Sequence, residues 1–167
     1  MHWMWIDRVI ELEPRTRCVA IKNVSLTEDV LHDHFPANGD QPALPVLPNT
    51  LVIEGMAQTA GILVGQANEF AEKVILAKLA RVTFFDAATP GHTIRYTAHI
   101  DRLDRTGAST SGCAELLDPI DGSVRQLATF DLMFSHIDHN RAGQGFPKHN
   151  FVFNRRFMDL LSQSGHF

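Results

Sequence analysis

The stretch NTLVIEGMAQTAGILVGQANEF, which runs from Asn49 to Phe70, is apolar on nearly every side over most of its length. A helix with this pattern is typical of a protein core, because a surface helix has one polar face. Glu54 and Gln58, the polar exceptions, are four residues apart. Gly61 and Gly65 continue the same face. The stretch therefore predicts one buried helix with a single stripe of polar and small side chains.

The chain that follows this helix has the pattern of successive β-strands. In TIRYTAHIDRLD, from Thr93 to Asp104, apolar and polar residues alternate. Other strands are predicted at Thr16–Val24, Val74–Phe85, about Ala108–Leu117 and Val124–Ile137. One buried helix and a run of antiparallel strands predict an α+β domain whose sheet wraps around the helix. The chain shows neither a βαβ alternation nor a glycine-rich phosphate loop, so a nucleotide-binding fold is not indicated.

Both ends of the chain are predicted to be helical. Residues Trp3–Leu12 have the apolar spacing of a helix, which Pro14 then breaks. Residues Asn154–Ser164 are predicted to form a short helix that stops near Gly165. Its apolar face is too large to leave in water, so we expect it to dock on the body or on a neighbouring subunit. Residues 1–167 are predicted to form one domain, with residues 139–150 as a loop and a C-terminal extension from about residue 140.

Composition places the chain among globular proteins. It has 167 residues, of which 44% are hydrophobic and 20% charged, enough for one domain with a real core. The net charge of −4 and the scattered basic residues give no reason to expect nucleic acid. Cys18 and Cys113 are expected to be small buried residues. The chain shows no signal peptide, and its longest uncharged stretch is too short to span a membrane, so we expect a cytoplasmic protein.

Glu54 is the first candidate for chemistry. An ionised carboxylate in an apolar helix is costly unless it is paired, and no Lys or Arg lies within one turn of it. We therefore expect Glu54 to hold its proton and to act as an acid, with Gln58 fixing its orientation. The alternative is that Glu54 turns towards solvent at the edge of the helix. From Glu54 alone, the two interpretations are equally good.

His34 is the second candidate. It lies in a long loop, Ser25–Pro48, and the ring of Pro36 restricts the backbone just after it. An imidazole held in a stiff loop suits a general base, although an ordinary surface histidine is the alternative.

The third element is the helix start, where the backbone N–H groups of Asn49 and Thr50 lack intrahelical acceptors. They can hold a thioester carbonyl oxygen as it gains negative charge, and Asn49 is a plausible N-cap.

The ordered motif HFP…LPVLPNTLVIEGMAQTAG resembles the active-site signature of the 3-hydroxyacyl-[acyl-carrier-protein] dehydratases, which are hotdog-fold enzymes. By this resemblance His34 and Glu54 occupy the catalytic positions. Asn49 and Thr50 occupy those of the oxyanion-binding amides, and Gln58 that of the motif's glutamine. The resemblance extends over about residues 6–134. Two features differ: extra residues within ANGDQPAL lengthen the loop after His34, and Asn49 replaces a customary glycine.

The resemblance implies reversible dehydration of a 3-hydroxyacyl thioester, carried by acyl carrier protein or by coenzyme A, without a metal or an organic cofactor. It also implies a homodimer whose sheets join edge to edge and whose active sites combine His34 of one chain with Glu54 of the other. A hotdog thioesterase that uses Glu54 alone, or a non-catalytic acyl-binding module, remains as an alternative. The pairs His32/His34 and His136/His139 have no companion ligands at a recognisable metal-site spacing.

Overall fold

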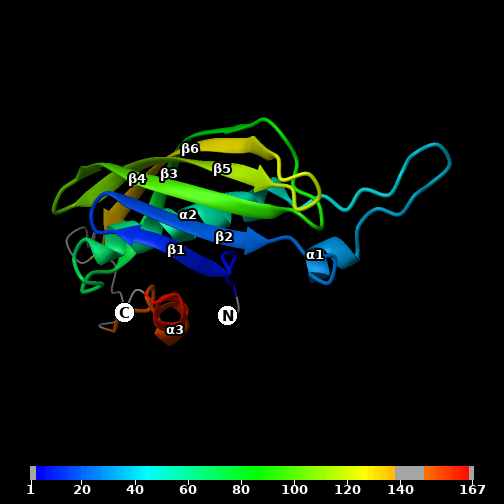
Figure 1. The fold of residues 1–167 in the computed structure, drawn as a ribbon. Coiled ribbons are helices and arrows are strands. Elements are labelled where there is room, and N and C mark those ends of the chain that lie inside the picture. The colour runs from blue at the N-terminus through cyan, green and yellow to red at the C-terminus, as the bar shows by residue number, and fades with distance from the viewer. Residues whose placement is uncertain (1–2, 138–148, 166–167) are drawn as a thin grey trace.

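The computed structural model describes residues 3–137 and 149–165. Its six strands form one antiparallel sheet in the order β1-β2-β4-β5-β6-β3. The strands are β1 (Arg8–Glu13), β2 (Arg17–Asn23), β3 (Val74–Phe84), β4 (Thr93–Leu103), β5 (Gly107–Leu117) and β6 (Val124–His136). The described helices are α1 (Asp29–His32), α2 (Asn49–Gln66) and α3 (Arg155–Gln163). The sheet arches over α2, and α3 lies on the far side of α2 next to β1 (Figure 1).

Helix α2 is the centre of the core, as its apolar sequence predicts. Twelve of its 18 residues are buried, and it contacts strands β2 to β6. Side chains such as Val52, Met56 and Leu63 are fully buried, and each burial contributes about 1.5–3 kcal/mol. Gly55 lets the helix lie directly on β4, because a Cβ atom there would come within 2.5 Å of the Tyr96 hydroxyl. The α+β prediction, with a sheet wrapped around one buried helix, is confirmed.

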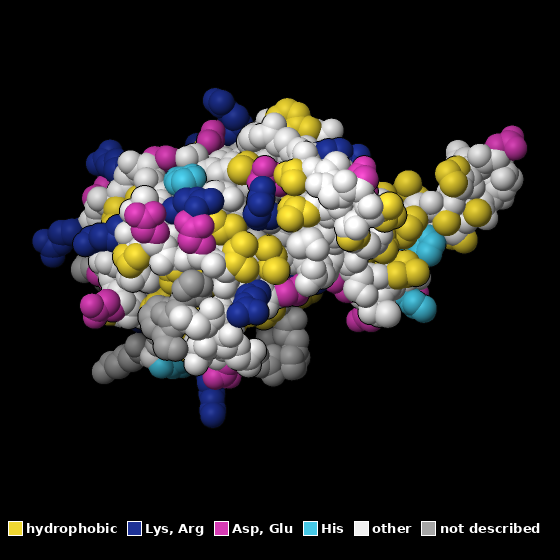
Figure 2. Space-filling model, in the orientation of Figure 1, with side chains coloured by type: hydrophobic (Ala, Val, Ile, Leu, Met, Phe, Trp, Pro, Cys, Tyr) yellow, Lys and Arg dark blue, Asp and Glu magenta, His cyan; other side chains and the backbone are white. Residues whose placement is uncertain are grey.

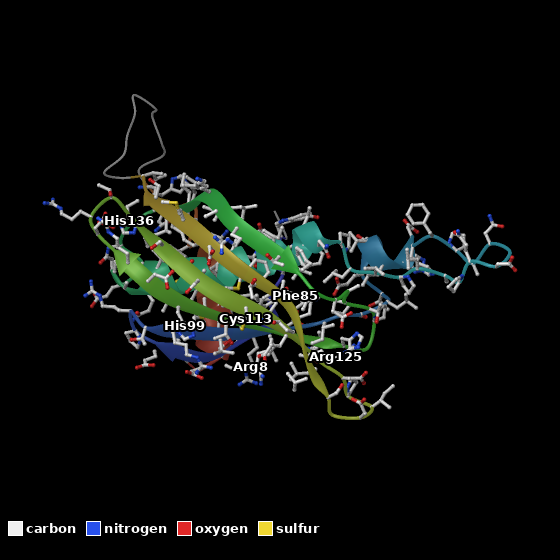
Figure 3. The ribbon with its side chains drawn as sticks, turned by 90° about the horizontal axis from the view of Figure 1, so that it is seen from above. Arg8, Phe85, His99, Cys113, Arg125 and His136 are labelled. Atoms are coloured by element: carbon white, nitrogen blue, oxygen red, sulfur yellow. The ribbon has the colours of Figure 1, made fainter. Side chains whose placement is uncertain are left out.

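The strands from β2 onwards match the predicted strands closely. Along β4, Ile94, Tyr96 and Ala98 face α2 and are fully buried, while His99 is exposed. Figure 3 looks onto the outer face of the sheet, where His99 of β4 and Cys113 of β5 lie. This division of the two faces follows from the alternating pattern, since successive side chains of a strand point to opposite sides.

The helix predicted over Trp3–Leu12 is wrong, because Arg8–Glu13 form strand β1 at the edge of the sheet. Strand β1 pairs antiparallel with β2, but its register shifts between Val9 and Glu11. Such a bulge inserts one residue and breaks the period of two. Ile6, just before the strand, is also buried, and its distance of three residues from Val9 is the spacing of a helix.

The long loop before α2 contains two features that the sequence did not predict. The short helix α1 is one, and a projecting arm, residues 34–46, is the other. Bridges between Phe35 and Leu44 and between Asn38 and Gln41 hold the two sides of the arm together. The arm extends away from the body in two perpendicular views (Figures 1 and 3). Its apolar side chains stand in the open (Figure 2), with Phe35 79% exposed.

The C-terminal helix docks on the body, as predicted. Leu161 of α3 is fully buried, and the Val9 N–H donates to Ser164 Oγ at 3.2 Å. The helix ends before Gly165, whose positive φ of 79° suits a residue without a side chain. The predicted loop at residues 139–150 lies largely outside the described residues. Within the described part of the chain, no helix is both long and apolar enough to cross a membrane.

Candidate active site

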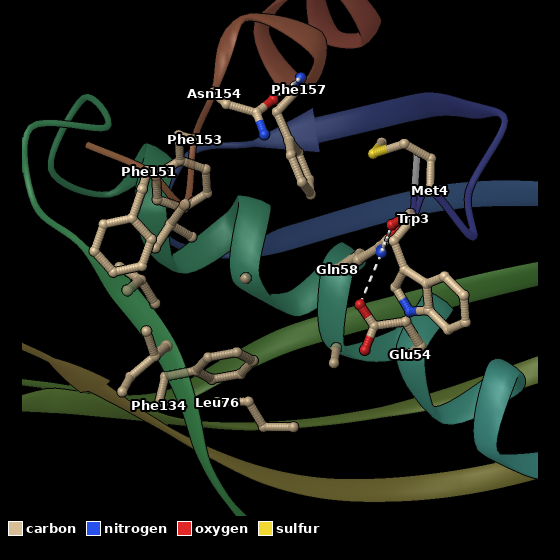
Figure 4. Close-up of a pocket in the computed structure, with 15 residues that line it drawn as sticks. Trp3, Met4, Glu54, Gln58, Leu76, Phe134, Phe151, Phe153, Asn154 and Phe157 are labelled. Carbon is tan, nitrogen blue, oxygen red and sulfur yellow. Dashed lines mark hydrogen bonds between the residues drawn. The ribbon is translucent and has the colours of Figure 1, made fainter. Parts of the chain in front are cut away.

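A cavity of about 420 Å³ runs along one face of α2. The residues of α2 that line it are Glu54, Ala57, Gln58 and Gly61, which is the polar and small stripe that the sequence predicts. The start of β3, Phe134 of β6, the N-terminal segment, residues 151–154 and Phe157 complete the wall (Figure 4). A largely apolar cavity with a few polar groups is typical of a small-molecule site.

Gln58 fixes the carboxyl group of Glu54. Its Nε2 donates to Glu54 Oε1 at 2.8 Å and to the Trp3 carbonyl at 2.7 Å (Figure 4). Its Oε1 accepts from the Trp5 N–H at 2.9 Å. Gln58 is only 7% exposed, so this amide has no freedom to turn. Glu54 is half-buried and lines the cavity. The geometry therefore favours an oriented carboxyl group over a side chain that turns away into solvent.

His34 is held by a different part of the fold. Its Nδ1 lies 2.9 Å from the carbonyl oxygen of Leu31, the fully buried residue of α1. A carbonyl oxygen only accepts, so Nδ1 must carry the proton, and in a neutral ring Nε2 is then free to act as a base. Helix α1 is itself anchored to the sheet, because Lys22 Nζ of β2 lies 2.5 Å from Glu28 Oε1 just before α1. The imidazole thus has a defined tautomer and a fixed support.

The single chain does not bring His34 and Glu54 into one cavity. His34 stands at the root of the arm, and it is not among the described residues that line the cavity of Glu54. Asn49 and Thr50 also lie outside that lining and are exposed. Thr50 precedes Glu54 by one helical turn, which is about 6 Å along the axis. Asn49 was expected to be the N-cap, but it is the first residue of the helix, and Pro48 is the N-cap.

The other polar candidates do not assemble into a site. Within residues 3–137 and 149–165, no group of three or more His, Cys, Asp or Glu side chains could hold a metal ion. His136 is fully buried with its Nδ1 2.8 Å from Glu72 Oε2, and His139 lies outside the described residues. Burial raises the pKa of the Cys18 thiol to about 12. Burial also raises the pKa of the Cys113 thiol, and the negative charge of Glu115 adds to this shift. Neither thiol is therefore prepared for nucleophilic attack.

Two parts of the cavity wall were not predicted from the sequence. One is the backbone of the N-terminal segment, which supplies partners to Gln58. The other is a group of phenylalanines, Phe151, Phe153 and Phe157, from the C-terminal extension. The apolar surface of this extension was a signal that it docks on the body, but nothing in the sequence pattern indicates where.

Comparison with known proteins places the chain in a family. A family model described as a FabA-like domain matches residues 2–124. A curated 3-hydroxyacyl-[acyl-carrier-protein] dehydratase FabZ of Symbiobacterium thermophilum is 35% identical over 119 residues, covering 71% of this chain and 80% of the relative. The FabZ dehydratase of Helicobacter pylori (strain Shi470) is 34% identical over 142 residues, covering 80% of this chain and 82% of that protein.

Solved structures agree on the fold. The dehydratase heterocomplex ApeI:P of Xenorhabdus doucetiae aligns with a TM-score of 0.59 at 22% identity, covering 80% of this chain and 83% of that one. An acyl-CoA hydrolase mutant (Asp43Ala) of Staphylococcus aureus aligns with a TM-score of 0.57 at 17% identity, covering 92% and 90%. The fold is thus the hotdog fold expected from the resemblance. Within that class, the chain belongs to the FabA-like family, which confirms the family that the motif suggested.

Proposed function

We propose that the protein is a hydro-lyase that reversibly dehydrates a 3-hydroxyacyl thioester to the trans-2-enoyl thioester. The observation that carries this proposal is the carboxyl group of Glu54, which Gln58 orients inside a largely apolar cavity. Membership of the FabA-like family and the similarity to FabZ dehydratases support the same reaction. The thioesterases among the structural neighbours are less than 25% identical, so they bear on the fold alone.

The proposed reaction divides the work between an acid and a base. The free Nε2 of His34 removes a proton from C2 of the substrate, while the thioester carbonyl oxygen gains negative charge. The backbone N–H groups of Asn49 and Thr50, at the positive end of α2, stabilise that oxygen. The C3–O bond then breaks, Glu54 gives its proton to the departing hydroxyl, and water leaves. The electrons of the C2–H bond become the new C2–C3 double bond.

The proposed site is completed by a second copy of the chain. Strand β3 forms one edge of the sheet, and its residues 76–81 are exposed. An exposed edge strand that carries apolar side chains such as Leu76 and Leu79 is a ready site for pairing with another strand. We propose that β3 pairs with β3 of the partner, and that the His34 of one chain serves the Glu54 cavity of the other. This explains why the single chain holds its base and its acid on separate surfaces.

The proposed substrate carrier is an acyl carrier protein, as in the names of the curated relatives. The proposed place of action is the cytoplasm. We further propose that residues 1–167 act as one domain, with the extension after about residue 140 as part of the body. The packing of Leu161 and the contact of Ser164 with Val9 support this last point.

One experiment separates this function from its rivals. The protein is incubated with a short trans-2-enoyl thioester, and the products are separated by mass. Hydration to the 3-hydroxyacyl thioester supports the proposal, because the reaction is reversible. Release of free thiol would instead identify a thioesterase. An unchanged substrate would indicate a non-catalytic acyl-binding module.

A further inference from the structure

The cavity extends from a polar part at Glu54 to an end that is bounded by the C-terminal segment, residues 149–165. Glu54 and Gln58 lie on one side of Figure 4, and Phe151 and Phe153 lie on the other. The cavity follows α2 from Glu54 to Gly61, which is about 10 Å along the helix axis. Beyond Gly61, the same helix face continues to Gly65, but that position is already occupied.

Phe153 occupies the space over Gly65. A Cβ atom at Gly65 would lie only 2.2 Å from the Phe153 ring, so the ring rests directly on the helix backbone. Phe153 is 7% exposed and makes edge-to-face contacts with Phe70 at 4.9 Å and Phe157 at 6.2 Å between ring centroids. Aromatic pairs in this geometry stabilise each other beyond their buried area. Phe153 is therefore a fixed wall across the stripe of small residues.

The segment that carries Phe153 is tied to the body on both sides. Asn150 Nδ2 donates to the carbonyl oxygens of Phe70 and Glu72 at 3.0 and 3.2 Å. Its Oδ1 accepts from the backbone N–H groups of Val152 and Phe153. At the other end of the segment, Ser164 accepts from Val9. These bonds make the wall a built part of the cavity, not a loosely placed tail.

We infer that the C-terminal segment sets the longest acyl chain that the enzyme accepts, with Phe153 as the specificity-determining residue. This inference rests on the proposed function, because it places the thioester beside Glu54 and the acyl tail along the α2 stripe. The tail is an unbranched alkyl chain of short to medium length, since the cavity beyond Gln58 is largely apolar and is bounded by Phe153 over Gly65. The wall lies beyond residue 124, where the match to the family model ends.

The test uses two opposite changes in the full-length protein. Phe153→Leu shortens the wall and opens the space over Gly65, while Gly61→Leu fills the cavity halfway. A side chain at Gly61 is sterically allowed, because its Cβ would meet only Phe134, at 3.7 Å. Phe85→Leu is the matched control, since Phe85 is 58% exposed and does not line the cavity. For each protein, kcat/KM for hydration is measured with 2-enoyl thioesters of increasing even chain length.

In the wild type, we expect kcat/KM to fall about tenfold or more once the chain exceeds the limit, the usual scale for a methylene that does not fit. Phe153→Leu should move this limit to longer chains and Gly61→Leu to shorter ones, whereas Phe85→Leu should leave it unchanged. The same limit in all four folded proteins would overturn the inference. Affinities of saturated acyl-pantetheines, measured by calorimetry, report the limit without any reaction. If no acyl chain is hydrated but the chain-length limit for binding still shifts in the variants, the proposed dehydration is refuted. The role of Phe153 in setting the limit is then still supported.

Discussion

Gln58 holds the carboxyl group of Glu54 through a 2.8 Å hydrogen bond from one turn further along α2. The same amide is bonded to the backbone of Trp3 and Trp5, so the orientation of the acid depends on the N-terminal segment as well as on its own helix. Positioned acids of this kind are effective because their geometry is set before the substrate arrives.

Loss of either proposed catalytic side chain should abolish most of the activity. Replacing Glu54 with Gln, or His34 with Ala, should each lower kcat at least about a hundredfold, which is the usual scale for a lost acid or base. His32→Ala is the matched control for the loop, because His32 is exposed and two residues away. Circular dichroism checks the fold of each variant. Near-wild-type turnover in either catalytic variant would refute the assignment.

Removing the amide that orients Glu54 should affect both stability and rate. Gln58→Leu leaves the Trp5 N–H and the Trp3 carbonyl without this partner, and each such loss costs about 1–3 kcal/mol in the free energy of unfolding. We also expect a lower kcat with little change in KM, because the carboxyl group is then free to turn. Gln66→Leu, on the same helix but outside the cavity lining, should keep wild-type kcat. Equal kcat values for the two variants would argue against a positioning role for Gln58.

The shared site predicts complementation between two inactive proteins. When His34→Ala and Glu54→Gln subunits exchange at random, half of the dimers are mixed, and each mixed dimer has one intact site. About a quarter of the wild-type activity should therefore return. Mixing the His34→Ala protein with a double variant that lacks both residues serves as the control and should restore nothing. A protein that stays monomeric at micromolar concentration would contradict the shared site.

The docked C-terminal helix should contribute measurably to stability. Leu161 is fully buried against the body, so Leu161→Ala should lower the free energy of unfolding by about 2–5 kcal/mol. Leu26→Ala, at a position 48% exposed, is the control and should cost much less. Deletion from Asn150 onwards should lower the melting temperature further, as measured by differential scanning calorimetry. A truncated protein as stable and as active as the full chain would show that the segment is dispensable.

The sequence was most informative where an element is bounded by clear turn signals. Strands β3 to β6 were predicted to within one residue at each end, and α2 was predicted from its first residue. Strand β1 was missed because the buried residues Ile6 and Val9 are three residues apart, which is the spacing of a helix. The sequence predicts only a loop for the arm, because the residues that its two bridges join show no strand pattern.

The candidate site likewise contains residues that the sequence predicts and contacts that it does not. Glu54, Gln58 and Gly61 follow from helical spacing, and the cavity lies along them. The contact of Gln58 with Trp3 and the position of Phe153 over Gly65 join segments that are far apart in the chain. Such contacts depend on tertiary packing, which no local pattern encodes.

The bonds of Asn150 to the backbone after α2 give the C-terminal segment its own point of attachment. The proposed acid and base lie on other elements, so the chemistry and the depth of the cavity are encoded in separate stretches of the chain. Replacing residues 149–165 as a unit should therefore change the acyl chain length of the products without altering the catalytic motif.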